Sequence, residues 1–541
     1  MLNRSIVLSV ILCIIANISS AQTWNWAKGE GDIGNDASNA VTTDASGNTY
    51  VTGNIAGKGN FSGTVYQGNG IYEMFIAKYD VAGNLVWVKL AGGSGNDDGN
   101  DVKWHNGFVY VCGTFEGTAF FETTSLISKG GADAFIAKYT DAGSLVWVRS
   151  MGGTGAEDAS AIDVDNAENV YVGGNYERAI TIGTTNLTTN NFYKESFYAK
   201  YSNNGNVSWA KTSTGNNGNL IAGIAFDNHQ AVYLTGYFGG SFKVGTATVN
   251  SVSSSYDIFL AKVEVSDGSV DWLKRSGSTY EDGAHDVCSD ADGNPSITGY
   301  FAGTALFDNN TVPYLDYNDV FIARYDTAGN NLWVRAGRGN KLDVGFSIAC
   351  DANGNLIATG MFQNIIDFDG RILNAPDLLD RDIFLISYDK SGNIRWITRA
   401  GAEDTDCALG VALHTDGDVS ISGYYLFKCS FGTIPIEYAE GNDLFIARYT
   451  PPVVSGIDEV GNDVLNVSVY PNPANSDAEL LVGNAELIPL AVRVCNALGQ
   501  EVYNGNLTTN CKLSTSNWSA GIYFIEVSSA EKVKTIKLIK Q

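Results

Sequence analysis

The segment that decides the fold is Phe75-Ile76-Ala77-Lys78-Tyr79-Asp80-Val81-Ala82-Gly83-Asn84-Leu85-Val86-Trp87. An aromatic-led apolar run is followed by a glycine turn and then by a strand that reaches a tryptophan, a pattern that predicts a β-hairpin. The aromatic-led run recurs at intervals of 60 to 63 residues, beginning at Phe75, Phe135, Phe197, Phe259, Phe321, Phe384 and Phe445. A tryptophan strand follows each of the first six runs, at Trp87, Trp147, Trp209, Trp272, Trp333 and Trp396.

Each repeat contains four predicted strands. A glycine-rich acidic turn follows the tryptophan strand, and then come a half-apolar strand and a second hairpin, as in residues 161–165 and 169–172. Four consecutive antiparallel strands with a period near 60 residues are typical of a propeller blade with an insert, whereas solenoids more often have shorter repeats and polar caps. We therefore predict an all-β chain with a seven-bladed β-propeller over residues 22–450.

The two ends of the repeat region complement each other. The last aromatic-led strand is followed by Pro451-Pro452 and not by a tryptophan strand, while Trp24-Asn25-Trp26 near the N-terminus has no aromatic-led strand before it. Pairing the N-terminal strand with the last blade would satisfy the backbone groups of both strands and remove an open edge. The sequence thus predicts a ring that its N-terminal strand closes.

Three motifs of the repeat resemble the SBBP family of bacterial β-propeller repeats. They are Asp-Ala-Ser-Gly-Asn-x-Tyr-Val-x-Gly (Asp44 to Gly53), Phe-Ile-Ala-Lys-Tyr, and Gly-x-Leu-x-Trp (Gly83 to Trp87). The resemblance covers about residues 24–450 and recurs seven times. It implies the propeller architecture, but no particular activity, because architecture is what defines that family.

The N-terminus has the layout of a secretory signal peptide. Arg4 precedes an apolar run from Ile6 to Ile18, and Ser19-Ser20-Ala21 places small residues where signal peptidase reads them. We predict a signal peptide over residues 1–21. No later segment reaches about 18 consecutive apolar residues, so we expect no transmembrane segment in the mature chain.

The net charge and the cysteines indicate which binding partners, metal sites and disulfides can be expected. With 59 acidic and 34 basic side chains, the formal net charge of -25 would repel phosphate backbones, so nucleic acid is not expected as a partner. The cysteines that follow the signal peptide are scattered, without histidines at zinc-ligand spacing. We expect them to fill apolar space within strands, with Cys495 and Cys511 the best-placed pair for an optional disulfide.

A different β-pattern begins after a linker at residues 451–456. Residues 457–541 alternate strands and turns, as expected of a small Ig-like β-sandwich. Val-Tyr-Pro-Asn-Pro-Ala, Leu-Gly-Gln, Ser-Ala-Gly-Ile-Tyr-Phe-Ile-Glu-Val and a lysine-rich end resemble the C-terminal sorting domain of proteins exported by type IX secretion. The resemblance implies passage through the outer membrane by the type IX machinery, followed by release or surface attachment.

Catalytic residues are not evident. The four histidines, His105, His229, His285 and His414, have no acid or nucleophile at a repeated offset, and we expect them in turns or partly exposed strands. His285 and His414 could still approach the central channel and act as a general base.

Acidic residues recur in the turns that lead into the first strand of a blade. The candidate binding residues are Asp97, Asp98, Glu157, Asp158, Glu281, Asp282, Glu403 and Asp404. Their carboxylates could bind calcium, but no calcium-loop spacing is present, so no cofactor is predicted and solvated turns are favoured. Inserts such as residues 175–195 and 362–382 should emerge on the same face as these turns, because alternate connections of an antiparallel blade return to the same side.

The predicted function is that of an exported, non-enzymatic binding or adhesion scaffold, secreted or held at the outer cell surface, whose variable loops recognise an extracellular glycan or protein. The alternative is a polysaccharide-active hydrolase or lyase with its site at the channel mouth. A passive structural spacer is the third interpretation.

Overall fold

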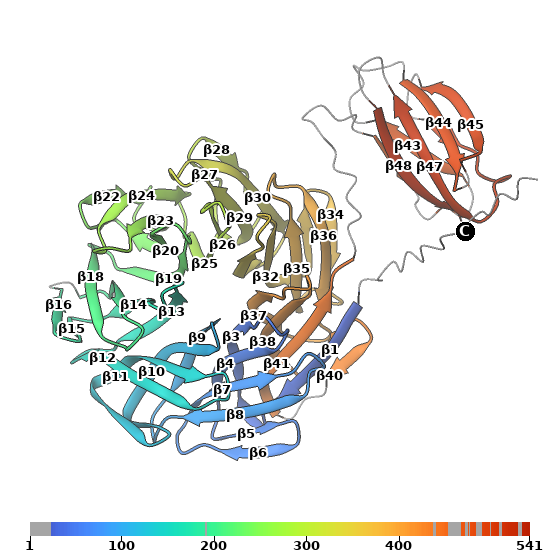
Figure 1. Cartoon of the computed structure of the whole chain (residues 1–541). Helices are drawn as coiled ribbons and strands as arrows, with labels where there is room; N and C mark the ends of the chain where they lie inside the picture. The colour runs from blue at the N-terminus through green and yellow to red at the C-terminus, as the bar shows by residue number, and fades with distance from the viewer. Residues whose placement is uncertain are drawn as a thin grey trace, which may run out of the picture. The chain divides into compact units, whose positions relative to one another are not determined.

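The computed structural model describes residues 23–189, 192–436 and 440–452, and in the C-terminal part residues 467–470, 474, 477–482, 490–497, 499–507, 511–528 and 533–540. The predicted signal peptide and most of the predicted linker lie outside the described residues. The chain separates into two compact units, Met1–Val453 and Val454–Gln541. The first unit is a ring of β-sheets around a central channel (Figure 1).

The first unit is a seven-bladed propeller, as the repeats predict, and each blade is an antiparallel sheet whose strands follow one another from the channel outward. The innermost strands are β3 (Ala37–Thr43), β9 (Asp98–His105), β13 (Asp158–Val164), β19 (Asn219–Phe226), β25 (Gly283–Ser289), β31 (Val344–Cys350) and β37 (Asp406–Leu413). The second strands are β4 (Thr49–Ile55), β10 (Phe108–Phe121), β14 (Val170–Tyr176), β20 (Ala231–Gly239), β26 (Pro295–Phe301), β32 (Leu356–Gln363) and β38 (Val419–Leu426).

The aromatic-led runs form the third strands and the tryptophan runs form the outer ones. The third strands are β7 (Glu73–Tyr79), β11 (Thr124–Thr140), β17 (Glu195–Tyr201), β23 (Tyr256–Glu264), β29 (Asp319–Tyr325), β35 (Arg381–Tyr388) and β41 (Glu440–Thr450). The outer strands of the first six blades are β8 (Leu85–Ala91), β12 (Leu145–Gly153), β18 (Val207–Gly215), β24 (Val270–Gly277), β30 (Asn331–Gly339) and β36 (Ile394–Ala400).

The N-terminal strand closes the ring, as predicted. β1 (Thr23–Glu30) pairs antiparallel with β41 and supplies the outer strand of the seventh blade, with Trp26 opposite Arg448. The short strand β2 (Ile33–Asn35) then pairs in parallel with the beginning of β41. The two ends of the propeller segment thus share one sheet, and β1 covers the outer edge of β41.

The repeated tryptophans join neighbouring blades. The indole N–H groups of six tryptophans donate to turn carbonyls of the next blade at 3.0 to 3.2 Å: Trp26 to Val81, Trp87 to Asp141, Trp147 to Asn203, Trp209 to Val265, Trp272 to Thr327, and Trp333 to Lys390. The turn glycine lies on the indole face: a Cβ on Gly83, whose φ is +80°, would lie 2.6 Å from the Trp26 ring. Glycine is therefore required there for both its backbone angle and its size.

The inserts between second and third strands are mainly hairpins rather than loose loops. They comprise β5 (Lys58–Phe61) with β6 (Thr64–Gln67), the extended ends of β10 and β11, β15 (Ala179–Ile182) with β16 (Thr185–Thr188), β21 (Ser241–Val244) with β22 (Ala247–Asn250), β27 (Ala305–Phe307) with β28 (Asn310–Val312), β33 (Ile365–Phe368) with β34 (Arg371–Asn374), and β39 (Cys429–Phe431) with β40 (Ile434–Ile436).

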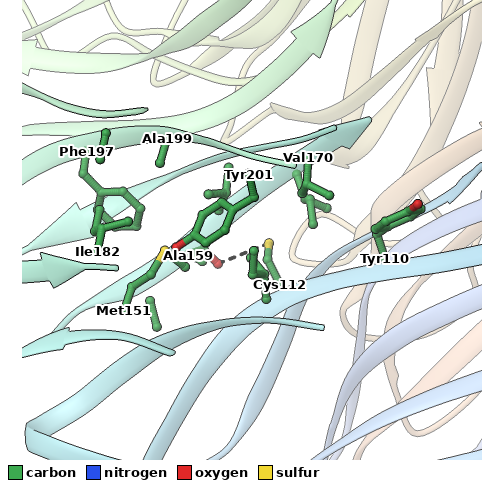
Figure 2. Close-up of a cluster of buried hydrophobic side chains, with 14 of the residues drawn as sticks. Tyr110, Cys112, Met151, Ala159, Val170, Ile182, Phe197, Ala199 and Tyr201 are labelled. Carbon is green, nitrogen blue, oxygen red and sulfur yellow. Dashed lines mark hydrogen bonds between the residues drawn. The ribbon is translucent and has the colours of Figure 1, made fainter. Parts of the chain in front are cut away.

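These insert hairpins belong to the hydrophobic core. β15, for example, pairs with β12 of the preceding blade. Its Ile182 is fully buried beside Met151, Phe197 and Tyr201 (Figure 2). The corresponding residues of the other inserts are also buried, at Phe61, Phe121, Val244, Phe307, Phe368 and Phe431. The inserts thus hold adjacent blades together.

The second unit consists of two small sheets. One contains β42 (Val467–Tyr470), β43 (Ala478–Val482) and β46 (Cys511–Leu513), and the other contains β45 (Glu501–Leu507), β44 (Leu490–Asn496), β47 (Gly521–Ser528) and β48 (Val533–Lys540). Leu480 and Leu513 of the first sheet share one buried cluster with Val492 and Ile525 of the second. This shared core makes the unit a β-sandwich.

Candidate functional site

The predicted acidic turn residues fall into two structural groups. Asp97, Glu157 and Asp282 are buried and accept hydrogen bonds from backbone N–H groups of their own turns, for example from Gly93 to Asp97 at 2.7 Å and from Gly153 to Glu157 at 2.6 Å. Asp98 and Asp158 are half-buried at the first residues of inner strands, while Glu281, Glu403 and Asp404 are exposed. The eight residues therefore do not form one site.

The buried group belongs to a sevenfold set of seam pairs, in which an acidic residue at the start of a third strand faces the residue that leads into the next blade. The seam pairs are Glu73 with Asp97, Asp133 with Glu157, Glu195 with Asn219, Asp257 with Asp282, Asp319 with Asp343, Asp382 with Asp406, and Asp443 with Asp36. The sequence alone did not lead us to the acidic residue that each third strand contributes to a seam pair. Its signal is an acidic residue two positions before every leading phenylalanine.

Burial raises the pKa of the seam carboxyls, and the paired carboxyl adds to the rise. The pKa rises to about 7 for Asp36, about 6 for Asp97, about 7 for Glu157, about 7 for Asp282, about 9 for Asp343 and about 8 for Asp406. Asp343 Oδ2 and Asp382 Oδ1 are buried without a hydrogen-bond partner. Two neighbouring buried carboxylates repel each other, and the raised pKa values favour a retained proton at pH 7 on Asp343 and Asp406.

The seam pairs are therefore structural contacts between blades. At the one seam with an amide, Asn219 donates to Glu195, which reproduces the hydrogen bond that a protonated carboxyl would make. Among the described residues, no three His, Cys, Asp or Glu side chains converge as a metal-binding group.

The central channel contains a cavity of about 520 Å³ that all seven inner strands line. Each inner strand has a β-bulge at the same place, and the bulged residues line the cavity: Asn39, Asn100, Ser160, Ala222, His285, Phe346 and Leu409. A bulge re-aims side chains. Three of these residues bond to the next blade, with Asn39 donating to Gly99 O at 3.0 Å, Asn100 to Ala159 O at 2.9 Å, and His285 Nδ1 lying 2.9 Å from Gly345 O.

The residues just after the bulges connect the inner strands. Asp101 accepts from Ile162 N at 2.8 Å, and Asp286, in the equivalent position three blades on, accepts from Ile348 N at 2.9 Å. Where this position is Gly223 or Gly410, the neighbouring strand itself approaches to about 3 Å of where a Cβ would stand. The channel aspartates thus stabilise the ring by connecting the inner strands of neighbouring blades.

One cation accompanies these aspartates. Lys103 Nζ lies 3.1 Å from Asp163 Oδ1, and the Asp163, Asp101 and Asp286 carboxylates raise the pKa of Lys103. Burial raises the pKa of Asp101 to about 7 and that of Asp286 to about 6. The channel therefore combines a protonated lysine with two aspartates whose pKa values are raised toward neutral pH.

The histidines take different positions. His285 lines the cavity, where its ring stacks on Phe346 at 5.1 Å and burial lowers its pKa. His105 also lines the cavity, whereas His414 is buried in the turn that follows β37, with Nε2 2.7 Å from Ser420 Oγ. Of the two proposed general bases, only His285 thus reaches the channel cavity.

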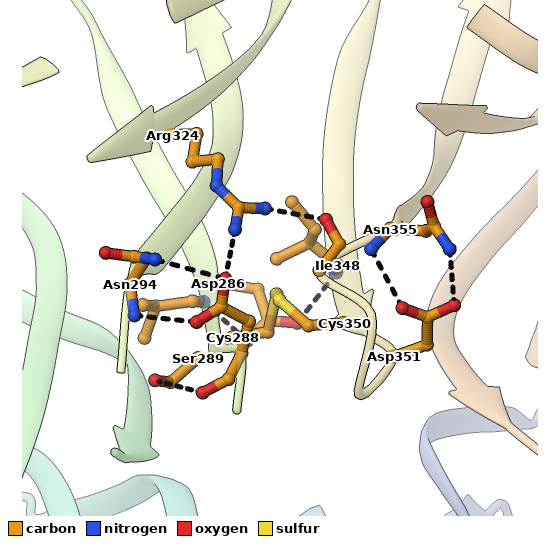
Figure 3. Close-up of a disulfide and its surroundings, with 12 residues drawn as sticks. Asp286, Cys288, Ser289, Asn294, Arg324, Ile348, Cys350, Asp351 and Asn355 are labelled. Carbon is orange, nitrogen blue, oxygen red and sulfur yellow. Dashed lines mark hydrogen bonds and ion pairs between the residues drawn. A yellow bond between two sulfur atoms is a disulfide. The ribbon is translucent and has the colours of Figure 1, made fainter. Parts of the chain in front are cut away.

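The expectation for the cysteines is wrong in one respect. Cys288 and Cys350 form a disulfide between the inner strands of adjacent blades, with their Cα atoms 5.9 Å apart (Figure 3). Their separation of 62 residues, one repeat, was the available signal. Cys495, the suggested partner of Cys511, is free, and its strand β44 belongs to the other sheet of the sandwich.

Two residues before each bulge, toward the interblade turns, lie seven register-equivalent residue pairs that we call the pre-bulge ring. Each pair joins an inner strand to a second strand: Ala37 with Asn54, Asp98 with Thr114, Asp158 with Asn175, Leu220 with Tyr237, Gly283 with Tyr300, Val344 with Met361, and Cys407 with Tyr424. The first three pairs contain polar side chains, and the last four are aromatic or apolar. The ring is therefore chemically divided although its backbone repeats.

The segments that return from the inserts to the third strands, here called return loops, lie on the same face. They bond to the interblade turns, with Ile71 N donating to Gly95 O at 3.1 Å and Gly131 N to Gly155 O at 2.8 Å. Return loops and turns expose large apolar side chains: Ile71, Phe192, Tyr193, Val252, Tyr280, Leu315, Tyr317, Leu378 and Leu379. The expected common face of inserts and turns therefore exists, with the return loops as its exposed part.

Comparisons with known proteins give a family match for the second unit and only low-identity matches over most of the chain. Residues 468–541 match the family model "Secretion system C-terminal sorting domain". An uncharacterized WD repeat-containing protein of Acanthamoeba polyphaga mimivirus is 23% identical over 456 residues, which make up 69% of this chain and 32% of that protein. The chain thus spans about a third of the length of that relative.

Solved structures resemble the chain at low identity. The quinohemoprotein alcohol dehydrogenase from Comamonas testosteroni has a TM-score of 0.37 and 10% identity, covering 84% of this chain and 79% of its own. BamB from Moraxella catarrhalis has a TM-score of 0.33 and 12% identity, covering 80% of this chain and 100% of its own. No helix among the described residues is long and apolar enough to cross a membrane. With its sorting domain and its ring of blades, the chain is a β-propeller protein of the type IX secretion route, exported to the cell surface or beyond.

Proposed function

We propose that the exported propeller is a non-enzymatic binding scaffold that recognises an extracellular glycan or protein with its return-loop face. The observation that carries this proposal is the set of large apolar side chains exposed on that face, among them Phe192, Tyr193, Leu378 and Leu379. Exposed apolar groups that gather on one face of an exported protein favour a binding surface. Loops on a rigid scaffold are also the usual place for recognition.

The proposal includes the processing of the chain. Signal peptidase cleaves after Ala21, the propeller of SBBP-type repeats occupies residues 22–450, residues 451–456 form a linker, and residues 457–541 form the sorting domain that the type IX machinery reads. Release of the propeller or its attachment at the surface follows export.

The test uses substitutions in the return loops. Deleting an insert would remove core residues such as Phe368 and would confuse loss of binding with loss of folding. The double variants Phe192→Ser with Tyr193→Ser and Leu378→Ser with Leu379→Ser should instead weaken binding of the full mature chain to intact bacterial cells and to a mixed glycan and protein array.

Matched controls are Val86→Ser and Leu332→Ser, which remove side chains that are 53% and 51% exposed on outer strands. These variants should bind like the unaltered chain. The proposal fails if the unaltered chain retains no glycan, protein or cell, or if both return-loop variants bind as tightly as the controls.

A further inference from the structure

The channel cavity is accessible to solvent from one face of the propeller. Its lining begins at the bulge residues and follows the inner strands to Asn166 and Asn228, which are exposed in the turns after β13 and β19. These turns lie at the end of the inner strands that is opposite the interblade turns. With a volume of about 520 Å³, the cavity has the size of a small-molecule pocket.

The bulge residues give this cavity two chemically different walls. All seven are partly exposed. They are polar in blades one to three and aromatic or apolar in blades five to seven: Asn39, Asn100 and Ser160, against His285, Phe346 and Leu409. One molecule in the cavity would therefore contact both polar groups and aromatic faces.

The polar wall offers hydrogen-bond acceptors. Asn39 and Asn100 donate through Nδ2 to Gly99 O at 3.0 Å and to Ala159 O at 2.9 Å. Within the part of the chain that the structure describes, no hydrogen bond engages the Oδ1 atom of either amide. Both side chains line the cavity, so these carbonyl oxygens are available to N–H or O–H groups of a ligand.

The aromatic wall adds a third acceptor and is held rigidly. The ring of His285 stacks on that of Phe346, with 5.1 Å between centroids and 4° between planes. Because Gly345 O only accepts, His285 Nδ1 carries the proton of their 2.9 Å contact, and burial lowers the pKa of His285, which leaves Nε2 as an acceptor. The disulfide of Cys288 and Cys350 joins the two strands that carry these rings (Figure 3).

The charges of the lining favour a positive ligand over an anion. Asp101, Asp163 and Asp286 line the cavity, and Lys103 is the cation among them. Lys103 pairs with Asp163 at 3.1 Å, whereas Asp101 and Asp286 form no ion pair among the described residues and accept backbone N–H groups. The three acids also raise the pKa of Lys103, so the cavity stabilises a positive charge.

We infer that the channel cavity binds a small alkylammonium ligand, such as a diamine. Its N–H groups donate to the amide oxygens of the polar wall and to His285 Nε2. Asp101 and Asp286 balance its charge, and its carbon chain lies against Phe346, whose ring face also attracts an ammonium group. This site is separate from the return-loop face, so the inference goes beyond the proposed function.

The experiment compares three four-carbon ligands of equal length: the diamine putrescine, the neutral butanediol and the anion succinate. Each is titrated calorimetrically into the full mature chain at low ionic strength, where charge effects are least screened. Putrescine should bind at least about tenfold more tightly than butanediol, since only the diamine carries charge, and succinate should not bind.

Variants locate the site. Asp286→Asn should weaken putrescine binding about tenfold, and Asn100→Leu about fivefold, the effects of one charge and one hydrogen bond. Lys103→Gln removes the ammonium group already in the cavity and should strengthen putrescine binding. Asp377→Asn, the same change at an exposed acid outside the cavity, should leave the affinity unaltered.

Thermal melting of each variant separates loss of binding from loss of folding, and Asp286→Asn carries the comparison if Asn100→Leu does not fold. The inference is overturned if putrescine does not bind, if butanediol binds equally well, or if folded Asp286→Asn binds like Asp377→Asn. Succinate binding that Lys103→Gln abolishes would reveal an anion site and overturn it as well. The return-loop variants should bind putrescine normally, so failure of this inference and failure of the proposed function are distinguishable.

Discussion

At the scale of single residues, the carboxyls of the seam pairs make the stability of the folded propeller depend on pH. These carboxyls have folded-state pKa values above the ordinary range because burial and the paired acid both disfavour ionisation. A raised pKa means that the folded state holds a proton which the unfolded chain has released. Stability from this source is complete below about pH 4 and is lost as the pH rises through the folded-state pKa.

Asp343→Asn should flatten this pH dependence. The pKa of Asp343 rises to about 9, so the unaltered chain loses at most about 1.4 kcal/mol per pH unit from this group between about pH 4 and 9. An amide cannot ionise, and the Glu195 with Asn219 seam already accepts one. We therefore expect the variant to melt above the unaltered chain at pH 8 and to show a smaller difference at pH 5, as measured by calorimetry.

The control for this experiment is Asp377→Asn, an exposed acid outside the seams. Its melting temperature should follow that of the unaltered chain at every pH. Equal slopes for Asp343→Asn and the unaltered chain would contradict the assignment of a buried proton to this seam.

At the scale of strands, one bulge repeated in every inner strand decides how the blades meet. It turns Asn39, Asn100 and His285 toward a neighbouring backbone carbonyl, and it places Asp101 and Asp286 where they accept backbone N–H groups across a seam. Without the added residue, every side chain beyond it would change face. The bulge therefore links local strand geometry to the channel lining.

Trp26→Ala should loosen the closure of the ring. Trp26 is 8% exposed, stacks on Tyr79 and donates to Val81 O, so truncating it removes core packing and a contact between blades seven and one. We expect a loss of about 3 to 5 kcal/mol in the free energy of unfolding and early proteolytic cleavage within β1.

Trp333→Ala is the matched change away from the closure, because Trp333 is also 8% exposed and donates to Lys390 O. It should lower stability to a similar extent without exposing β1 to protease. An unchanged melting temperature for Trp26→Ala would show that β1 contributes little to closure.

At the scale of the whole chain, the propeller and the sorting domain have separate cores. Removing residues 457–541 should leave a folded propeller inside the outer membrane, since the sorting domain directs the last export step. Cell fractionation in a bacterium with type IX secretion, with immunoblotting of medium, surface and periplasm, measures this outcome. The full-length Val86→Ser chain should be exported normally, and a truncated chain that reaches the medium equally well would contradict the prediction.

Local patterns in the sequence were sufficient for the architecture. Phe75 to Trp87 specify one hairpin through the aromatic run, the glycine and the tryptophan, and regular repetition of that hairpin predicts the blades. The missing partner strands at Trp26 and Phe445 predict the closure. These features depend on residues close together in the chain, or on repetition, and both are visible without coordinates.

The partners across the seams were decided only by the tertiary structure. Asp97 was recognised as an acidic turn residue, but its buried neighbour Glu73 lies on a strand of the previous blade, and Cys288 meets Cys350 only because two inner strands lie side by side. The division of the pre-bulge ring likewise depends on strand register, which brings Asp158 opposite Asn175 and Leu220 opposite Tyr237. Sequence patterns define strands, but burial and the pKa values that follow from it arise where strands from different repeats come into contact.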